Sequence, residues 1–293
     1  MSWTREGIIR KGRSQHSMLH LVTYWVVVAC SLLTLVCDSV LMAEDASQRK
    51  KTSIEIPEDI KTIPAVDISI EDDPKQRYFL IGNTEKPIPR NEGRRLLVVL
   101  PGGSGDAAFS PFIRRIYKHV LNDQWVVAQV VAPVWSEQQA EKIVWPIKAL
   151  TTADVKITTE ELFDRVVKDV SERTVIDDYQ VYAMGWSSSG PAVYAIAAGR
   201  DKPLAGAFIA MSVFKTDHLP EFQNRQTPFF LLQSPDDRVT PFRFAESARE
   251  FLSEHEVKVK LQKYAGGHGW RGNIYESLTS GIDWLTESSG PED

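Results

Sequence analysis

The run Val181–Gly190, VYAMGWSSSG, constrains the fold most strongly. An apolar segment stops at Gly185 and places Ser187 two residues later, where a sharp turn from a buried strand into a helix is expected. In a strand–turn–helix of the G-x-S-x-G type, the serine takes a strained backbone conformation that exposes its hydroxyl. Glycines flank it because side chains there would collide with the neighbouring elements. The pattern predicts that Ser187 is a nucleophile.

One residue departs from this pattern. Ser189 stands where the second glycine is expected, but serine is small and Gly190 follows it. Moving the nucleophile to Ser188 or Ser189 would put Trp186 or Ser187 at the leading glycine position, so Ser187 is preferred. The alternative is that these serines only cap the start of an ordinary helix, a position that serine favours.

The composition indicates one globular catalytic domain. The chain has 293 residues, of which 43% are hydrophobic and 25% charged. Its net charge of −5 leaves no basic surface for phosphates, which argues against nucleic acid as a partner. Cys30 and Cys37 lie in the first forty residues, so disulfides, thiolate metal sites and cysteine catalysis are excluded from the rest of the chain.

Residues 1–43 predict an export segment. Basic residues precede a largely apolar stretch, Met18–Met42, and small-residue cleavage character follows at Leu41–Ala43. The stretch is also long enough to remain as a membrane anchor. Either outcome predicts an extracytoplasmic domain: periplasmic, secreted or held at the membrane by its N-terminus. Residues 44–62 are polar and interrupted by proline, which predicts a linker before a catalytic domain over 63–293.

Apolar runs alternate with helical patterns through that domain. An opening hairpin is expected from Val66–Ile70 and Arg77–Ile81. Further strands are expected at 96–100, 126–131, 181–184, 206–211, 229–232 and 257–264, and helices at 111–121, 158–170, 191–199, 241–253 and 275–287. This alternation predicts an α/β fold, with a mostly parallel central β-sheet flanked by helices on both faces. Active residues of such sheets gather at the carboxyl ends of the strands.

A serine nucleophile needs a base, and His268 is the best candidate. It lies in Ala265–Trp270, AGGHGW, directly after a predicted strand, where glycines leave little packing to explain a histidine. His218 and His255 also follow Ser187, but both lie among polar residues and are expected to be solvated.

The base needs an acid to orient it, and two aspartates are available. Asp236 and Asp237 follow the predicted strand at 229–232, in the segment QSPDDRVTP. Aspartates are also common in plain turns, where they bond their own backbone. Asp237 is preferred, with Asp236 as the alternative.

Backbone N–H groups near a glycine-rich loop could stabilise an oxyanion. The strand at 96–100 leads into Pro101–Asp106, PGGSGD, although a plain tight turn would explain those glycines equally well. Gly103 and Ser104 are the expected donors from this loop, together with the N–H of Ser188.

Taken together, the segments PGGSG, GWSSSG, SPDDRVTP and GGHGW, in the order serine, acid, histidine, resemble the α/β-hydrolase superfamily. The chain looks most similar to its compact carboxylesterase/phospholipase, dienelactone hydrolase and polyester depolymerase-like branch, over roughly residues 77–288. The resemblance implies the α/β-hydrolase fold, no cofactor or metal, and a triad of Ser187, Asp237 and His268. Pro101 and Gln233 depart from the pattern, because many relatives have histidine at both positions.

The expected substrate is a small or polymer-end ester. The long segment 132–157 contains two tryptophans, and two more lie near the proposed catalytic residues. Together they could line an apolar pocket, or each could simply pack in the core. These four are Trp135, Trp145, Trp186 and Trp270. The alternatives to a serine esterase are a serine peptidase of the same fold and a noncatalytic binding module on the same scaffold.

Overall fold

A computed structural model describes residues 56–87, 93–220 and 225–289. The predicted export segment and most of the predicted linker lie outside the described residues. Within the described residues, no helix is both long and apolar enough to cross a membrane.

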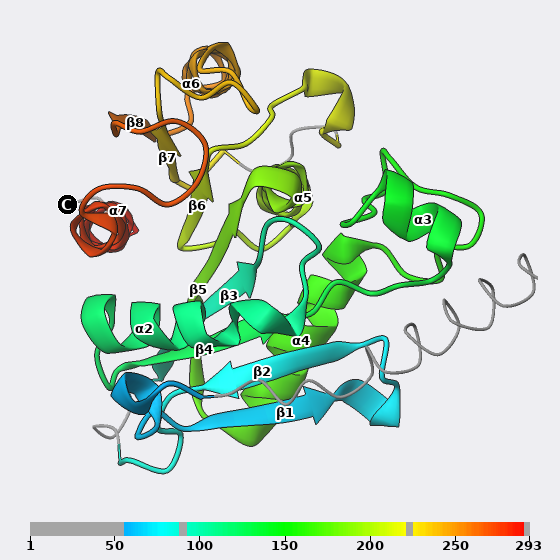
Figure 1. The fold of residues 1–293 in the computed structure, drawn as a ribbon, viewed down its shortest axis with the longest axis vertical. Coiled ribbons are helices and arrows are strands. Elements are labelled where there is room, and N and C mark those ends of the chain that lie inside the picture. The colour runs from blue at the N-terminus through cyan, green and yellow to red at the C-terminus, as the bar shows by residue number, and fades with distance from the viewer. Residues whose placement is uncertain (1–55, 88–92, 221–224, 290–293) are drawn as a thin grey trace, which may run out of the picture. The chain divides into compact units, whose positions relative to one another are not determined.

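The described residues form one eight-stranded sheet (Figure 1). Its strand order is β1-β2-β4-β3-β5-β6-β7-β8, and every pairing from β4 to β8 is parallel. The strands are β1 (Ala65–Ser69), β2 (Arg77–Ile81), β3 (Arg94–Leu100), β4 (Trp125–Val130), β5 (Ile176–Trp186), β6 (Gly206–Ala210), β7 (Phe229–Gln233) and β8 (Val259–Lys263). The expected opening hairpin is confirmed, because β1 and β2 pair antiparallel and β2 then pairs antiparallel with β4. The predicted mostly parallel sheet is confirmed.

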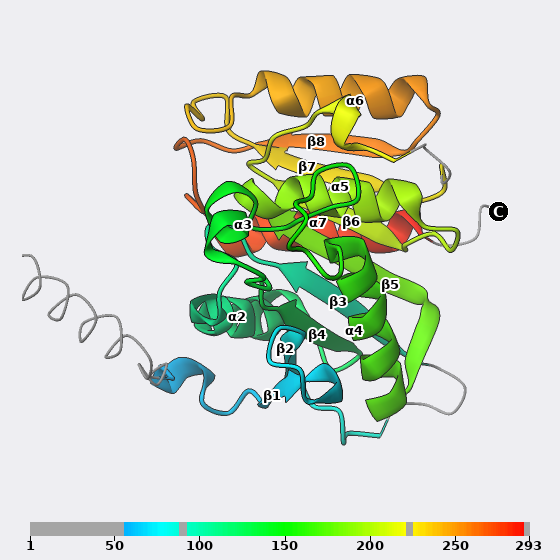
Figure 2. The same ribbon diagram turned by 90° about the vertical axis from the view of Figure 1, so that its right-hand side faces the viewer.

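Helices cover both faces of the sheet. They are α2 (Ser110–Val120), α3 (Glu137–Lys142), α4 (Thr159–Arg173), α5 (Gly190–Gly199), α6 (Arg243–Glu254) and α7 (Ile274–Ser288). Residues of α4, α5 and α6 share one core cluster, and residues of α2 and α7 share the other. In Figure 2, α5 passes in front of the sheet and α7 lies behind it.

Alternation along the strands builds these two clusters. Leu96, Val98 and Leu100 of β3 face the α4–α6 side, whereas Leu97 and Val99 face the α2–α7 side, and all are at most 1% exposed. A strand buried on both faces has no polar side, which explains the near-continuous apolar runs.

A capping box holds the start of α4. The side chain of Thr158 accepts a hydrogen bond from the backbone of Glu161, whose own side chain bonds back to the N–H of Thr158. This capping box satisfies two N–H groups that would otherwise have no partner in the first turn.

Two segments differ from the sequence predictions. The short helix η1 (Glu58–Ile60) buries Ile60 completely, and Asp59 pairs with Arg115 of α2. The packed body therefore begins before residue 63, inside the predicted linker. The short helix α3 was not predicted, because its six residues carry almost no apolar pattern.

Gly281 of α7 gives a test of how this helix packs. A Cβ at this position would lie 2.2 Å from Phe208 Cε2 and 2.8 Å from Phe230 Cδ1. Alanine is better than glycine in a helix by about 1 kcal/mol, but here the clash should dominate. We expect Gly281→Ala to lower the free energy of unfolding by about 1–3 kcal/mol in urea titrations. The exposed control Asp283→Ala should stay within about 0.5 kcal/mol of wild type. An unchanged Gly281→Ala protein would contradict this packing.

Candidate active site

Ser187 lies at the carboxyl end of β5, as the first residue of the short helix η4 (Ser187–Ser189). Its φ of +54° is one that side-chain-bearing residues rarely adopt, and it lifts the residue out of the strand direction. Gly185 is required beside it, because a Cβ there would lie 2.7 Å from both Ser189 Oγ and Val193 Cγ2. The predicted sharp turn is confirmed.

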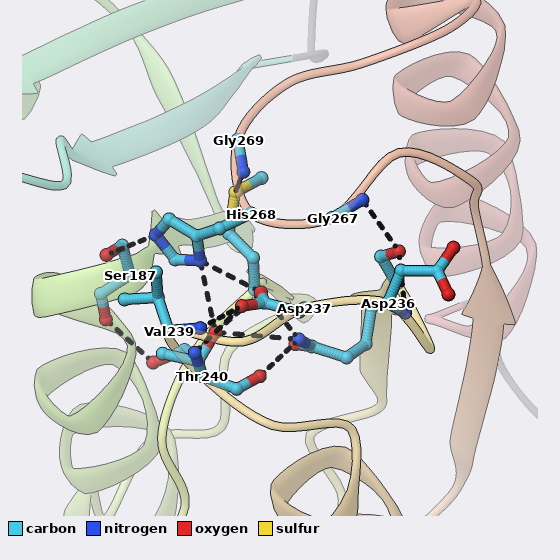
Figure 3. A network of polar contacts seen from close by, with 12 residues as sticks. Ser187, Asp236, Asp237, Val239, Thr240, Gly267, His268 and Gly269 are labelled. Carbon is cyan, nitrogen blue, oxygen red and sulfur yellow. Dashed lines mark hydrogen bonds and ion pairs between the residues drawn. The ribbon is translucent and has the colours of Figure 1, made fainter.

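The structure brings Ser187, His268 and Asp237 into one hydrogen-bonded chain (Figure 3). Ser187 Oγ lies 3.1 Å from His268 Nε2, and His268 Nδ1 lies 2.8 Å from Asp237 Oδ2. Because the ionised carboxylate can only accept, it fixes the imidazole proton on Nδ1. Nε2 is then free to accept the proton of the Ser187 hydroxyl.

Asp237 is held in a dense set of hydrogen bonds, and its side chain is fully buried. Besides His268, the donors to its carboxylate are Val239 N (2.8 Å), Thr240 N (2.8 Å), Thr240 Oγ1 (2.8 Å) and Gln233 Nε2 (3.0 Å). Burial alone would raise the pKa of Asp237, but these hydrogen bonds to the charged form outweigh burial and hold the pKa below its ordinary value. The carboxylate therefore stays ionised.

The two neighbouring aspartates differ clearly in exposure and in the direction of their side chains. Asp236 is exposed, and in Figure 3 its carboxylate points away from His268. Its backbone N–H donates to Ser234 Oγ at 3.2 Å. Of the two aspartates, Asp237 is the one beside His268.

The glycine-rich loop around His268 is anchored from three strand ends. Its glycines adopt positive φ angles, which include +77° at Gly267 and +108° at Gly269. Gly267 N donates to Ser234 Oγ after β7, and Gly269 N lies 3.2 Å from the sulfur of Met211 after β6. Tyr264, which follows β8, donates its hydroxyl to Gly267 O at 2.8 Å. These anchors could not be predicted from sequence, because each joins residues that are distant along the chain or of ordinary type.

Ser189 fills the position of the second elbow glycine and has a structural role there. It is completely buried, its Oγ accepts from Trp186 N at 2.9 Å, and it donates to Leu100 O at 2.6 Å. Leu100 ends β3, directly before Pro101. The hydroxyl therefore joins the turn after β5 to the loop after β3.

The residues expected to supply the oxyanion donors lie at the surface, two of them in this loop and one in the turn after β5. Gly103, Ser104 and Ser188 are all exposed, and Ser188 Oγ donates to Gly103 O at 2.8 Å. The structure thus places the loop after β3 against the residue that follows Ser187.

The four tryptophans lie in different surroundings. Trp145 and Trp186 are each 4% exposed and belong to the two core clusters on opposite faces of the sheet. The ammonium nitrogen of Lys75 lies over Trp135, 5.4 Å from the centroid of the Trp135 ring. Trp270, which is partly buried, packs on Trp186 with 5.5 Å between ring centroids. Trp145 instead supports the loop after β3, because its indole N–H donates to Pro101 O.

The sequence and the structure give different results when compared with known proteins. No family model matches the sequence, and a search of curated proteins finds no match. Solved structures do match. The esterase Est2 of Thermogutta terrifontis with propionate bound has a TM-score of 0.55 at 15% identity, over 79% of this chain and 96% of that one. MGS-M1, an α/β-hydrolase from a deep-sea metagenome library, gives 0.55 at 13% identity, over 78% and 98%.

A third match is FphF of Staphylococcus aureus, a fluorophosphonate-binding serine hydrolase. Its TM-score is 0.51 at 13% identity, over 78% of this chain and 98% of that one. At these identities the likeness concerns the fold. The chain has the α/β-hydrolase fold that the sequence resemblance implied.

Removing the Ser189 hydroxyl tests its structural role. We expect both Ser189→Ala and Ser189→Gly to lower the free energy of unfolding by about 1–3 kcal/mol, because a buried N–H and a buried carbonyl lose their partner. The glycine variant matters most, since it restores the usual elbow sequence and should still destabilise. The control is Ser188→Ala, which removes an exposed neighbouring hydroxyl and should cost less than about 1 kcal/mol. Equal stability of Ser189→Gly and wild type in urea titrations would refute the role.

Proposed function

We propose that this protein is a serine hydrolase that cleaves carboxylic esters through an acyl-Ser187 intermediate. The observation that carries the proposal is the chain from Ser187 Oγ through His268 to the buried carboxylate of Asp237. Esterases and serine hydrolases among the structures of the same fold support it.

In the first half-reaction, Ser187 Oγ attacks the ester carbonyl carbon while His268 Nε2 takes the hydroxyl proton. Asp237 holds the ring and stabilises the imidazolium that forms. The negative charge moves onto the former carbonyl oxygen, where we expect N–H groups of Ser188 and of the loop after β3 to stabilise it. The intermediate then collapses, the alcohol leaves with the proton from His268, and the acyl group remains on Ser187.

In the second half-reaction, water replaces the alcohol. His268 removes a proton from water, the hydroxide adds to the acyl carbonyl, and the carboxylic acid leaves as Ser187 regains its proton. The chain's own groups perform every proton transfer in this cycle.

We further propose small or polymer-end esters as substrates, handled outside the cytoplasm. The partly buried ring of Trp270 lies two residues after His268 and packs on Phe112 and Trp186, which gives the site an aromatic side. The apolar stretch Met18–Met42 supports export. Amide cleavage is the alternative reaction, because Ser187, assisted by His268 and Asp237, could attack a peptide carbonyl in the same way.

The first test is covalent labelling of the full chain. We expect wild-type protein to react with a fluorophosphonate probe and to hydrolyse p-nitrophenyl acetate, and we expect Ser187→Ala to do neither while retaining its unfolding transition. The loss in kcat should reach about 10³-fold or more. A parallel assay with peptide p-nitroanilides separates ester from amide preference. A folded wild-type protein that neither labels nor turns over would refute the proposal and favour a noncatalytic module.

The acid is tested by a matched pair of neighbours. Asp237→Asn should lower kcat by about 10³–10⁴-fold, because the neutral amide no longer selects the Nδ1–H tautomer or stabilises the imidazolium. Asp236→Asn makes the same chemical change at the exposed neighbour and should stay within about twofold of wild type. The readout is p-nitrophenyl acetate hydrolysis, with unfolding curves as a check on folding. A larger loss in Asp236→Asn would reverse the assignment.

A further inference from the structure

The loop after β3 is held through its backbone carbonyls. Leu100, the last residue of β3, and the next three residues each have a carbonyl oxygen that accepts a hydrogen bond. In the order of these acceptors, the donors are Ser189 Oγ (2.6 Å), Trp145 Nε1 (3.0 Å), Gly105 N (3.0 Å) and Ser188 Oγ (2.8 Å). With its carbonyls directed at these donors, the loop has a defined set of peptide orientations.

The bond from Ser188 differs from the others in its position. It joins two exposed residues that are 85 positions apart, Ser188 and Gly103. Under the proposed function, the backbone N–H groups of these same residues serve the oxyanion. A side chain of the turn after β5 thus holds the peptide that must work together with that turn.

Glycine makes such a restraint necessary. Gly103 has a φ of +61° and no side chain, so it opposes little rotation of the peptide between Gly103 and Ser104. In the described part of the chain, the N–H groups of Gly103 and Ser104 donate to no protein acceptor that would fix them. The hydroxyl of Ser188 is therefore the group that selects the orientation of this peptide.

The planarity of the peptide gives the consequence. The C=O and N–H of one trans peptide point in opposite directions. With Gly103 O directed at Ser188, the N–H of Ser104 points away from Ser188. The N–H of Gly103, which belongs to the preceding peptide, remains the donor that can converge with the N–H of Ser188.

We propose that Ser188 is a positioning residue. Its hydroxyl fixes the peptide after Gly103, so that the N–H groups of Gly103 and Ser188 converge on the oxyanion. The inference rests on the proposed serine-hydrolase function. The hydroxyl touches no reacting atom, and its effect comes through preorganisation of donors, where a displacement of about 1 Å can cost up to about 10²-fold in rate.

The test is Ser188→Ala in the full chain, which keeps the N–H of residue 188. We expect kcat/KM for p-nitrophenyl acetate to fall about tenfold, a smaller loss than removal of a donor itself. The Ki for an alkyl trifluoromethyl ketone, which forms an anionic tetrahedral adduct with serine, should rise by a similar factor. The Ki for the matching secondary alcohol, which cannot form the adduct, should stay within about twofold.

Two further variants serve as controls. Ser188→Thr keeps a hydroxyl and should return kcat/KM to within about threefold of wild type. Ser171→Ala removes another exposed serine hydroxyl that also donates to a backbone carbonyl, Val167 O at 2.9 Å on α4, and should change neither inhibitor constant.

The outcomes separate the inference from the proposed function. If Ser188→Ala matches wild type in kcat/KM and in ketone inhibition, the positioning role is wrong while the esterase proposal stands. Equal losses for the ketone and the alcohol would indicate general damage to the site and would also overturn the inference. A wild-type protein without labelling or turnover would overturn the proposed function and this inference together.

Discussion

The parallel pairing of β3 with β5 is the constraint on which the site depends. In this register Leu100 lies opposite Gly185, so both strands end at the same edge of the sheet. β7 and β8 end at that edge too, with Gln233 opposite Lys263. The turns that follow therefore deliver their side chains to one place from segments far apart in sequence. Because the central strands are buried on both faces, this edge is rigid, and hydrogen-bond distances near 3 Å can be maintained across it.

Two residues that depart from the α/β-hydrolase pattern are buried polar residues whose side chains find hydrogen-bond partners. Ser189 replaces an elbow glycine, and Gln233, 1% exposed, stands where relatives have histidine. The amide of Gln233 donates to Asp237 Oδ2 at 3.0 Å and to Thr240 O at 2.7 Å. A buried amide with two such acceptors stabilises the carboxylate and avoids the cost of an unpaired donor. Both departures thus follow one rule, in which a polar side chain is accommodated because strand ends nearby supply partners.

Much of this could be predicted from sequence, and the limits have physical reasons. Buried parallel strands read as apolar runs, so β3, β4, β6 and β7 were located to within two residues. β5 was predicted only from Val181, because Asp177–Gln180 carry no apolar run. The predicted candidates Ser187, Asp237 and His268 follow strands that end at one edge, a property of topology. The anchors Trp145, Ser189 and Met211 could not be predicted, since their partners depend on tertiary contacts. The role of each candidate in catalysis stays a prediction.

The three consecutive serines of η4 direct their hydroxyls to three different partners. Ser187 has a φ of +54°, and the tight turn that it begins makes the three successive side chains diverge. In η4, Ser187 faces His268, Ser188 reaches Gly103 O, and Ser189 points inward to Leu100 O. A strand would instead place the first and third residues on one side. Two hydrogen bonds, to Leu100 O and Gly103 O, thus join this strained turn to the end of β3 and to the loop that follows it. They restrain that loop where glycines leave its backbone free.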